Sequence, residues 1–207
     1  MTELLKVKNT LQKNLNFSED SLSKLGIYHS ELLKHNQKLN LIGKSTEEII
    51  WSRHILDSAQ IVKFIDFKGN KSLSDLGSGA GFPGLVISIF NQNPMFHVKL
   101  FEKSPLKANF LSHMVDLLKL KCEIVLGDIF KQEIITDYVV TRAFKKLPII
   151  MGISREIVKK NHKLIIMKGK SAQEEINTAL NETKFKYKLA NSITNKEAKI
   201  ILVDVIK

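Results

Sequence analysis

A glycine-rich loop in the middle of the chain has the residues needed to hold a nucleotide. Residues 72–87 read SLSDLGSGAGFPGLVI, with Gly77, Gly79, Gly81 and Gly84 at the front of an otherwise apolar run. At the end of the first strand of a doubly wound sheet, glycines let the backbone approach a nucleotide closely. The spacing therefore predicts a nucleotide-binding loop between a strand and a helix.

The loop fits the patterns of two cofactor classes. Asp75, Gly77, Gly79 and Gly81 match the D/E-x-G-x-G-x-G loop of S-adenosylmethionine (SAM) methyltransferases. Shifted to Gly79, Gly81 and Gly84, the same stretch satisfies the G-x-G-x-x-G pattern of dinucleotide-binding proteins. The glycines alone leave both cofactors open, and a purely structural turn is a third interpretation.

Two acidic residues at predicted strand ends favour SAM. Glu102 ends the segment HVKLFE, where a carboxylate accepts hydrogen bonds from ribose hydroxyls in either class. Asp128 follows the segment IVLG, at the place where methyltransferases hold the adenine amino group. The Tyr-x-x-x-Lys pair of many dehydrogenases does not occur in the sequence. SAM is therefore the expected cofactor, and an NAD(P)-dependent oxidoreductase is the alternative.

Positive charge is concentrated in one part of the chain. The formal net charge is +11, and all but three of the 32 basic residues are lysines. Residues 142–170 contain nine basic residues and one acidic residue, Glu156, a local net charge of +8. The members at predicted strand ends beside the loop are Arg142, Lys145, Lys146, Lys168 and Lys170. This clustering favours a nucleic-acid substrate, and a solvated lysine-rich surface is the alternative.

The elements that must position these residues change in character near residue 68. Before it, leucines recur at helical spacing, and STEE at residues 45–48 has the form of a capping box that opens a helix. After it, apolar strands alternate with helical stretches, and a polar turn separates the last two strands. We expect an α/β, Rossmann-like SAM-dependent methyltransferase fold, with a mostly parallel seven-stranded sheet and an antiparallel last strand. Residues 1–67 are expected to form a helical segment packed on the core, and residues 68–207 the methyltransferase domain.

Composition also limits the partners and the location of the protein. The longest apolar runs, such as residues 82–90, fall short of the roughly 18 to 20 residues that cross a bilayer. The single cysteine, Cys122, has no internal disulfide partner and lies in KCEIVL, which is predicted to be a buried strand. We expect a monomeric cytoplasmic protein with no membrane partner and no metal.

The choice of methyl acceptor is narrowed by what the sequence lacks. Methylation of pyrimidine carbon 5 needs a nucleophilic cysteine, and Cys122 is predicted at the wrong edge of the sheet. Enzymes that methylate exocyclic amino groups commonly carry an Asn/Asp-Pro-Pro-aromatic loop, where this chain reads TRAF. Guanine N7 has an in-plane lone pair and no proton to lose, so a site could methylate it by aligning N7 with the sulfonium methyl, without a general base. A non-catalytic RNA-binding module that retains the loop is a further alternative.

Six motifs resemble, in order and spacing, one family of enzymes. They are YHSELLKHNQKLNL, RHILDS, DLGSGAGFPG, EKSPLKANFL, TRAF and MKG. This set is similar to the bacterial 16S rRNA guanine-N7 methyltransferases, also called glucose-inhibited division protein B. The resemblance implies SAM-dependent methylation of one guanine, 527 in the usual rRNA numbering, in the cytoplasm. The partner it implies is 16S rRNA in the small ribosomal subunit or an assembly intermediate.

Site residues follow from the resemblance together with the arguments above. The expected cofactor-binding residues are Asp75, Gly77, Gly79, Gly81, Phe82, Glu102, Asp128, Ile129 and Arg142. The expected RNA-binding residues are Arg53, Lys107, Arg142, Lys145, Lys146, Lys168 and Lys170. The chain departs from the usual family pattern at His35, Ile42 and Ala108.

A histidine and a carboxylate in RHILDS are the candidates for a catalytic role, together with Arg142, although no general base is required. His54 and Asp57 are three residues apart, so on a helix they share one face and the carboxylate could fix the imidazole. We expect this helix to cover the cleft, with Arg53 reaching a phosphate or SAM. The alternative is a helix packed on the sheet. Trp51 is expected in the core, whereas Phe144 beside Arg142 could equally stack on a base.

Overall fold

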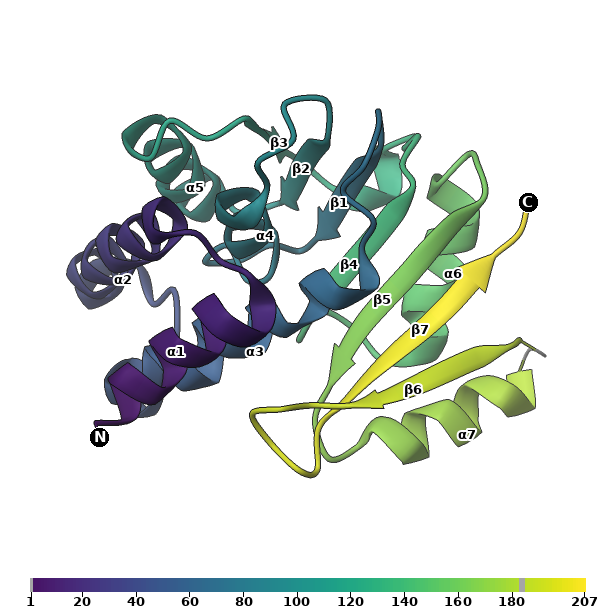
Figure 1. Cartoon of the computed structure of the whole chain (residues 1–207). Coiled ribbons are helices and arrows are strands. Elements are labelled where there is room, and N and C mark those ends of the chain that lie inside the picture. Colours follow the sequence, from purple (N-terminus) through teal and green to yellow (C-terminus); the bar gives the residue numbers. More distant parts are fainter. Residues whose placement is uncertain (1, 183–184) are drawn as a thin grey trace.

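The computed structural model describes residues 2–182 and 185–207, which form one seven-stranded sheet with helices on both faces (Figure 1). The strands are β1 (Ser72–Leu76), β2 (His97–Glu102), β3 (Cys122–Leu126), β4 (Tyr138–Arg142), β5 (His162–Lys168), β6 (Tyr187–Asn191) and β7 (Lys199–Val205). Their order is β3-β2-β1-β4-β5-β7-β6, and β7 runs antiparallel to both of its neighbours. The predicted mostly parallel sheet with an antiparallel last strand is confirmed.

The helices divide between the two faces of the sheet. One face carries α1 (Glu3–Leu15), α2 (Glu19–Leu39), α3 (Asp57–Ala59), α4 (Gly84–Phe90) and α5 (Pro105–Leu117). The other carries α6 (Leu147–Ile157), α7 (Ala172–Glu182) and the short 3₁₀ helix η4 (Ile129–Lys131). Both faces of the central strands are therefore buried, in agreement with the apolar runs VV of β4 and LIIM of β5. In β5, for example, Leu164 and Ile166 contribute to one core and Ile165 to the other.

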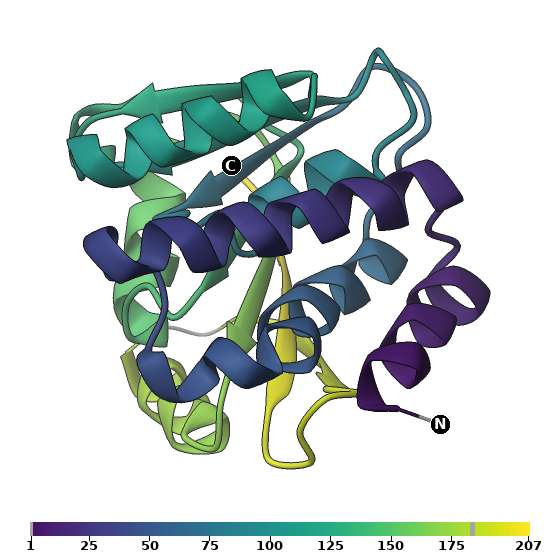
Figure 2. The same cartoon turned by 90° about the vertical axis from the view of Figure 1, so that its left-hand side faces the viewer.

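The N-terminal helices share the core of the sheet. Leu25 of α2 and Leu85 of α4 are both fully buried in one continuous apolar cluster that also includes strand residues. Helix α2 begins where the Ser18 hydroxyl accepts a hydrogen bond from Ser21 N and ends at Asn40, whose φ is 47°. Figure 2 shows α2 lying across this face beside α5. The division at residue 67 stays a prediction, because this cluster runs across it.

The helix predicted to open at residues 45–48, which would run through EEIIWSRHILDSAQIVKFI, is instead a series of short helical turns. It comprises the 3₁₀ helix η1 (Lys44–Ile49), the π-helix η2 (Trp51–Leu56), α3 and the 3₁₀ helix η3 (Gln60–Phe64). The capping-box prediction is wrong, because Gly43 precedes η1 and no side chain caps it. The polar groups nearby have other partners: the Thr46 hydroxyl bonds to His54, and Glu47 accepts from Asn36. Single π-helical turns often occur at functional sites.

Two further expectations concern membrane crossing and Cys122. Within the described part of the chain, no helix is both long enough and apolar enough to span a bilayer. Strand β3 lies at the edge of the sheet and its residues are partly buried or exposed, so the prediction of a buried strand is wrong there. Cys122 itself is partly buried at the start of β3, and burial raises the pKa of its thiol to about 12.

Candidate active site

The glycine loop is fastened to the carboxyl end of β2. The amides of Gly77 and Ser78 both donate to the carbonyl oxygen of Phe101, at 3.0 and 3.1 Å. The next free amide, Gly79 N, donates to Glu102 Oε2 at 2.9 Å. Gly79 has a φ of 58°, and a Cβ added there would meet only the carbonyl oxygen of Gly77, at 4.0 Å. The loop thus leaves open space beside Gly79, as close approach of a ligand requires.

Asp75 supports this loop from below. Its side chain is fully buried, and Oδ2 accepts a hydrogen bond from the amide of Gly84 at 2.9 Å. Burial raises the pKa of this carboxyl group to about 7, an effect that the Gly84 amide opposes. Asp75 does not line the cavity described below, and its side chain bonds to the backbone at the end of the loop instead.

Tyr28 is a supporting residue that sequence reasoning missed. It is fully buried on α2, and its hydroxyl donates to the carbonyl oxygen of Ala80 in the loop at 2.7 Å. Its ring also packs against Phe82, with the centroids 5.4 Å apart. The motif YHSELLKHNQKLNL begins at this residue, which was the only available signal. The N-terminal helices therefore help to shape the glycine loop directly.

A cavity of about 660 Å³ lies above the loop at the carboxyl edge of the strands. Among the expected cofactor-binding residues, it is lined by Gly77, Gly79, Phe82, Glu102, Asp128, Ile129 and Arg142, but not by Asp75 or Gly81. The volume is in the range of cofactor sites. Lys103 and Phe130 also line it and were not among the predicted site residues, although Lys103 lies in the motif EKSPLKANFL.

Two carboxylates stand on the cavity wall. The two oxygens of Glu102 accept from Gly79 N and Ser104 N, which fixes the side chain at the end of β2. An ionised carboxylate offers about four lone-pair positions, so acceptor capacity remains for a diol. Asp128 is exposed after β3, and its Oδ1 accepts from the amide of Phe130 at 3.1 Å. Both acceptors and the open loop fit the ribose and adenine groups of SAM.

Arg142, at the end of β4, joins the sheet to the turns of residues 44–64. Its Nε donates to Asp57 Oδ2 at 2.9 Å, and its Nη2 donates to the carbonyl oxygen of Arg53 at 2.8 Å. The third contact joins Nη1 to Nδ1 of His54 at 3.2 Å. The side chains of Arg142 and Asp57 are only 14% and 9% exposed. This is a buried ion pair with most of its hydrogen-bonding groups engaged.

His54 is held neutral by this arrangement. Burial and the nearby charges of Arg142 and Arg53 lower its pKa to about 3. Because a guanidinium only donates, Nδ1 of His54 must accept, so the proton is on Nε2 and is donated to the Thr46 hydroxyl at 2.8 Å. The ring stacks on Phe82 with centroids 5.0 Å apart. Both ring nitrogens are therefore occupied.

The expected His54–Asp57 pair is replaced by a shared partner. The carboxylate of Asp57 accepts from Arg142, Gln60 and Thr194, and the imidazole bonds to Arg142 and Thr46. The helical spacing that suggested the pair does not apply, because His54 lies in the π-helix η2 and Asp57 begins α3. The contacts of both residues with Arg142, at the end of β4, could not be predicted from local spacing.

A second cavity of about 420 Å³ lies on the other side of Arg142. Its lining includes four basic residues, Arg53, Arg142, Lys168 and Lys199, and two acidic ones, Asp57 and Glu175. Arg142, His54 and Ala143 border both cavities. The two cavities are therefore separated mainly by Arg142 and its partners Arg53, His54 and Asp57, here called the Arg142 cluster.

The expected RNA-binding lysines lie in different environments. Lys145, Lys146 and Lys170 are exposed, and Lys107 is partly buried on the wall of the larger cavity. Lys168 instead forms an ion pair with Glu175 at 2.8 Å, with only 9% of its side chain exposed, and bonds to the carbonyl oxygen of Lys145. The ammonium group of Lys168 is thus turned inward to Glu175 and the backbone of Lys145, away from solvent.

The two aromatic candidates differ in surroundings. Trp51 packs against the core, and its ring stacks on His29 with the centroids 5.7 Å apart, in agreement with the expected core position. Phe144 is partly buried on the cavity wall, so close to the loop that a Cβ on Gly77 would lie 2.4 Å from its ring.

Solved structures that resemble this chain include SAM-dependent methyltransferases. The chain superposes on one from Aquifex aeolicus with a TM-score of 0.61 and 14% identity, over 86% of this chain and 98% of that one. Fibrillarin from Aeropyrum pernix, solved with natively bound SAM, gives a TM-score of 0.55 and 15% identity over 74% and 75%. These likenesses show that the chain has the Rossmann-like fold of SAM-dependent methyltransferases, as predicted.

Sequence relatives narrow this class to one family. The profile described as GidB, rRNA small subunit methyltransferase G, matches residues 21–202. Proteins named ribosomal RNA small subunit methyltransferase G from Pelagibacter ubique and Orientia tsutsugamushi are each 36% identical over 202 residues, covering 95% and 98% of this chain and 94% and 100% of theirs. The chain belongs to this family of SAM-dependent rRNA methyltransferases, which confirms the resemblance, the enzyme class and the cofactor.

Proposed function

We propose that the protein transfers the methyl group of SAM to N7 of guanine 527 of 16S rRNA, in the cytoplasm, on the small ribosomal subunit or an assembly intermediate. The proposal that rRNA is the substrate rests on membership of the methyltransferase G family, whose model matches residues 21–202. The choice of N7 is supported by the site, because His54, the histidine closest to Arg142, has no free nitrogen with which to remove a proton. Guanine N7 needs no such step.

The chain's own residues would bind and align the reactants. When bound, SAM supplies an electrophilic methyl group on a sulfonium. Glu102 would accept from the ribose hydroxyls and Asp128 from the adenine amino group, beside the open backbone at Gly79. Arg142 and Phe82 line the larger cavity, where the guanine would have to lie beside the methyl group, and the smaller cavity with its four basic residues would receive an adjoining phosphate. Catalysis would come from alignment in an enclosed site.

The two alternatives are set apart by different observations. The position of β7 between β5 and β6 differs from the 3-2-1-4-5-6 strand order of dinucleotide-binding folds, and the family match also disfavours an oxidoreductase. A non-catalytic RNA-binding module would take up no label from methyl-labelled SAM when given small subunits that lack the modification.

The position and the atom can be tested in one experiment. Small subunits from cells lacking this gene are incubated with SAM and the purified protein, and the rRNA is then treated with borohydride and aniline, which cleave at 7-methylguanine. We expect one new cleavage site, at guanine 527, that depends on both SAM and protein. Labelling without cleavage would contradict N7, and cleavage elsewhere would contradict the position.

The exposed lysines Lys145 and Lys146, which follow β4 at the carboxyl edge of the sheet and are here called the rim, provide a separate prediction for RNA binding. Changing both Lys145 and Lys146 to alanine should weaken RNA binding roughly tenfold and reduce the slope of log affinity against log salt by about 1.5, because two phosphate contacts are lost. SAM affinity, measured by calorimetry, should not change. The matched control is the Lys186→Ala, Lys188→Ala double variant, which removes two exposed lysines near the opposite edge of the sheet. Equal RNA affinities for the two double variants would contradict the rim assignment.

A further inference from the structure

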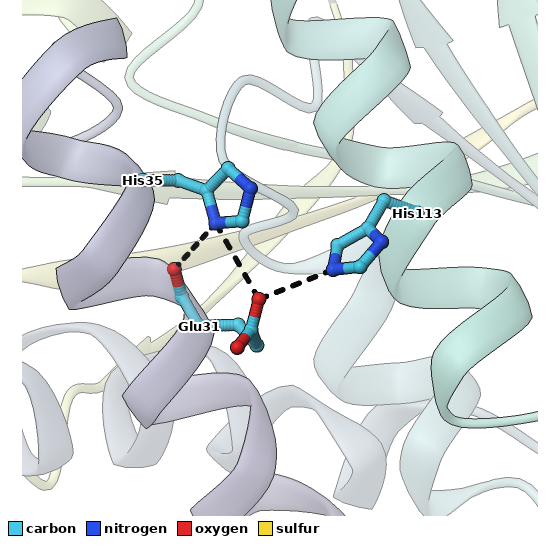
Figure 3. Close-up of side chains that lie close together, drawn as sticks. All are labelled: Glu31, His35 and His113. Carbon is cyan, nitrogen blue, oxygen red and sulfur yellow. Dashed lines mark hydrogen bonds and ion pairs between the residues drawn. The ribbon is translucent and has the colours of Figure 1, made fainter.

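Two histidines and a glutamate meet between α2 and α5, away from the cavities described above (Figure 3). Glu31 and His35 are four residues apart on α2, and His113 faces them from α5. Glu31 Oε2 lies 3.1 Å from His113 Nε2 and 3.6 Å from His35 Nδ1. One potential ligand atom from each residue lies within 4.8 Å of the other two.

We infer that Glu31, His35 and His113 form a binding site for a divalent transition-metal ion, with Zn²⁺ as the best match. Zinc–ligand distances of about 2.0–2.1 Å place the ligand atoms of a tetrahedral site about 3.3 Å apart. The two separations from Glu31 Oε2 bracket that value. A small closing movement of the two rings would complete the three protein ligands.

The donor set selects the class of cation. Two imidazoles and one carboxylate suit Zn²⁺, Co²⁺, Ni²⁺ or Cu²⁺, whereas Mg²⁺ and Ca²⁺ prefer oxygen ligands. The His113 side chain is 45% exposed and that of Glu31 is 19% exposed, so solvent can reach the cluster and supply a fourth ligand. The site is therefore expected to exchange its ion with solution.

Neighbouring groups already orient the ligands. The second oxygen of Glu31, Oε1, lies 3.4 Å from Lys34 Nζ, which leaves Oε2 directed at the histidines. The ring of His35 packs against Phe110 and His113, each with centroids 5.3 Å apart. His35 Nδ1 also contacts the carbonyl oxygen of Glu31 at 2.9 Å. Binding through this nitrogen requires its proton to leave to solvent, so cation uptake exchanges a proton for the metal.

The cluster joins two helices that both contact parts of the candidate cofactor site. Helix α2 carries Tyr28, which bonds to the loop, and α5 carries Lys107, which lines the cavity wall. A cation held between these helices would fasten α2 to α5 without taking part in methyl transfer. The inference is independent of the proposed rRNA position.

Calorimetry with Zn²⁺ on the full chain, stripped beforehand with a chelator, tests the site. We expect one saturable site, absorption typical of tetrahedral coordination when Co²⁺ is used, and no binding of Mg²⁺. At 100 times the dissociation constant, Zn²⁺ should raise the melting temperature by about 5–10 °C. Absence of saturable Zn²⁺ binding would overturn the inference.

Variants at the ligands identify which residues hold the ion. Both His113→Ala and Glu31→Gln should weaken Zn²⁺ binding at least about 30-fold, and each should lose the Zn²⁺-dependent rise in melting temperature. His97→Ala, which removes an exposed histidine at the start of β2, is the matched control and should bind like the unmodified chain. Melting curves in chelator establish that each variant is folded. Unchanged Zn²⁺ affinity in both ligand variants would overturn the assignment.

Discussion

Replacing Arg142 with methionine is expected to lower the free energy of unfolding by about 3 kcal/mol and methyl transfer by about 100-fold. Methionine keeps much of the side-chain length but leaves the carboxylate of Asp57 buried without its cation, which is costly in a site this enclosed. The loss of activity follows because the same guanidinium positions Arg53, His54 and the wall of both cavities, and small displacements of aligned reactants reduce rates strongly.

A double-mutant cycle with Asp57→Asn separates pairing from packing. If the ion pair is the main contact, the destabilisations of Arg142→Met and Asp57→Asn should fall short of additivity in the double variant by about 1–2 kcal/mol. Urea denaturation gives the stabilities, and methyl-labelled SAM gives the rates. Full additivity would mean that the two side chains act independently, against the geometry at 2.9 Å.

Replacing Gly84 with alanine is expected to cost about 2 kcal/mol of stability and to weaken SAM binding about tenfold. A Cβ at this position would lie 2.6 Å from Asp75 Oδ2 and 2.8 Å from Asp75 Cβ, so the buried carboxylate or the helix must move. That movement would disturb the hydrogen bond that holds the loop to β1. Urea denaturation and calorimetry with SAM measure the two effects.

Gly152→Ala is the matched control because it makes the same chemical change in an open place. Gly152 is exposed within α6, and an added Cβ there would meet nothing within 4 Å. Alanine should therefore stabilise the helix, by about 0.5–1 kcal/mol. Equal effects of the two substitutions would show that Gly84 does not depend on its close contact with Asp75.

The strands and the cofactor loop could be predicted because their signals are local. Residues 72–76 form a short strand that leads directly into glycines, and the carboxylates of Glu102 and Asp128 lie at or just after the ends of their own strands. Each signal lies within a few residues of the feature it marks. The parallel sheet then brings these strand ends to one edge, and the cavity there includes Gly77, Glu102 and Asp128.

The Arg142 cluster could not be predicted because its partners are distant in the sequence. Arg142 is 85 residues from Asp57 and 88 from His54, and the local spacing of those two suggested a direct pair instead. Tyr28 reaches Ala80 across 52 residues. Lys168 was expected on the RNA-binding rim, but Glu175, one helical turn into α7, draws it inward. In each case a tertiary partner overrides the local pattern.

The hydrogen bond from Tyr28 to Ala80 has a consequence for how the enzyme becomes active during folding. The loop backbone and Arg142 each depend on groups from residues 28–57, so the sheet alone would present its cofactor edge without these supports. Because one apolar core includes both parts of the chain, the cofactor edge is complete only when the N-terminal helices are docked on the sheet. Affinity for SAM is therefore expected to measure whether the N-terminal third of the chain is packed on the sheet.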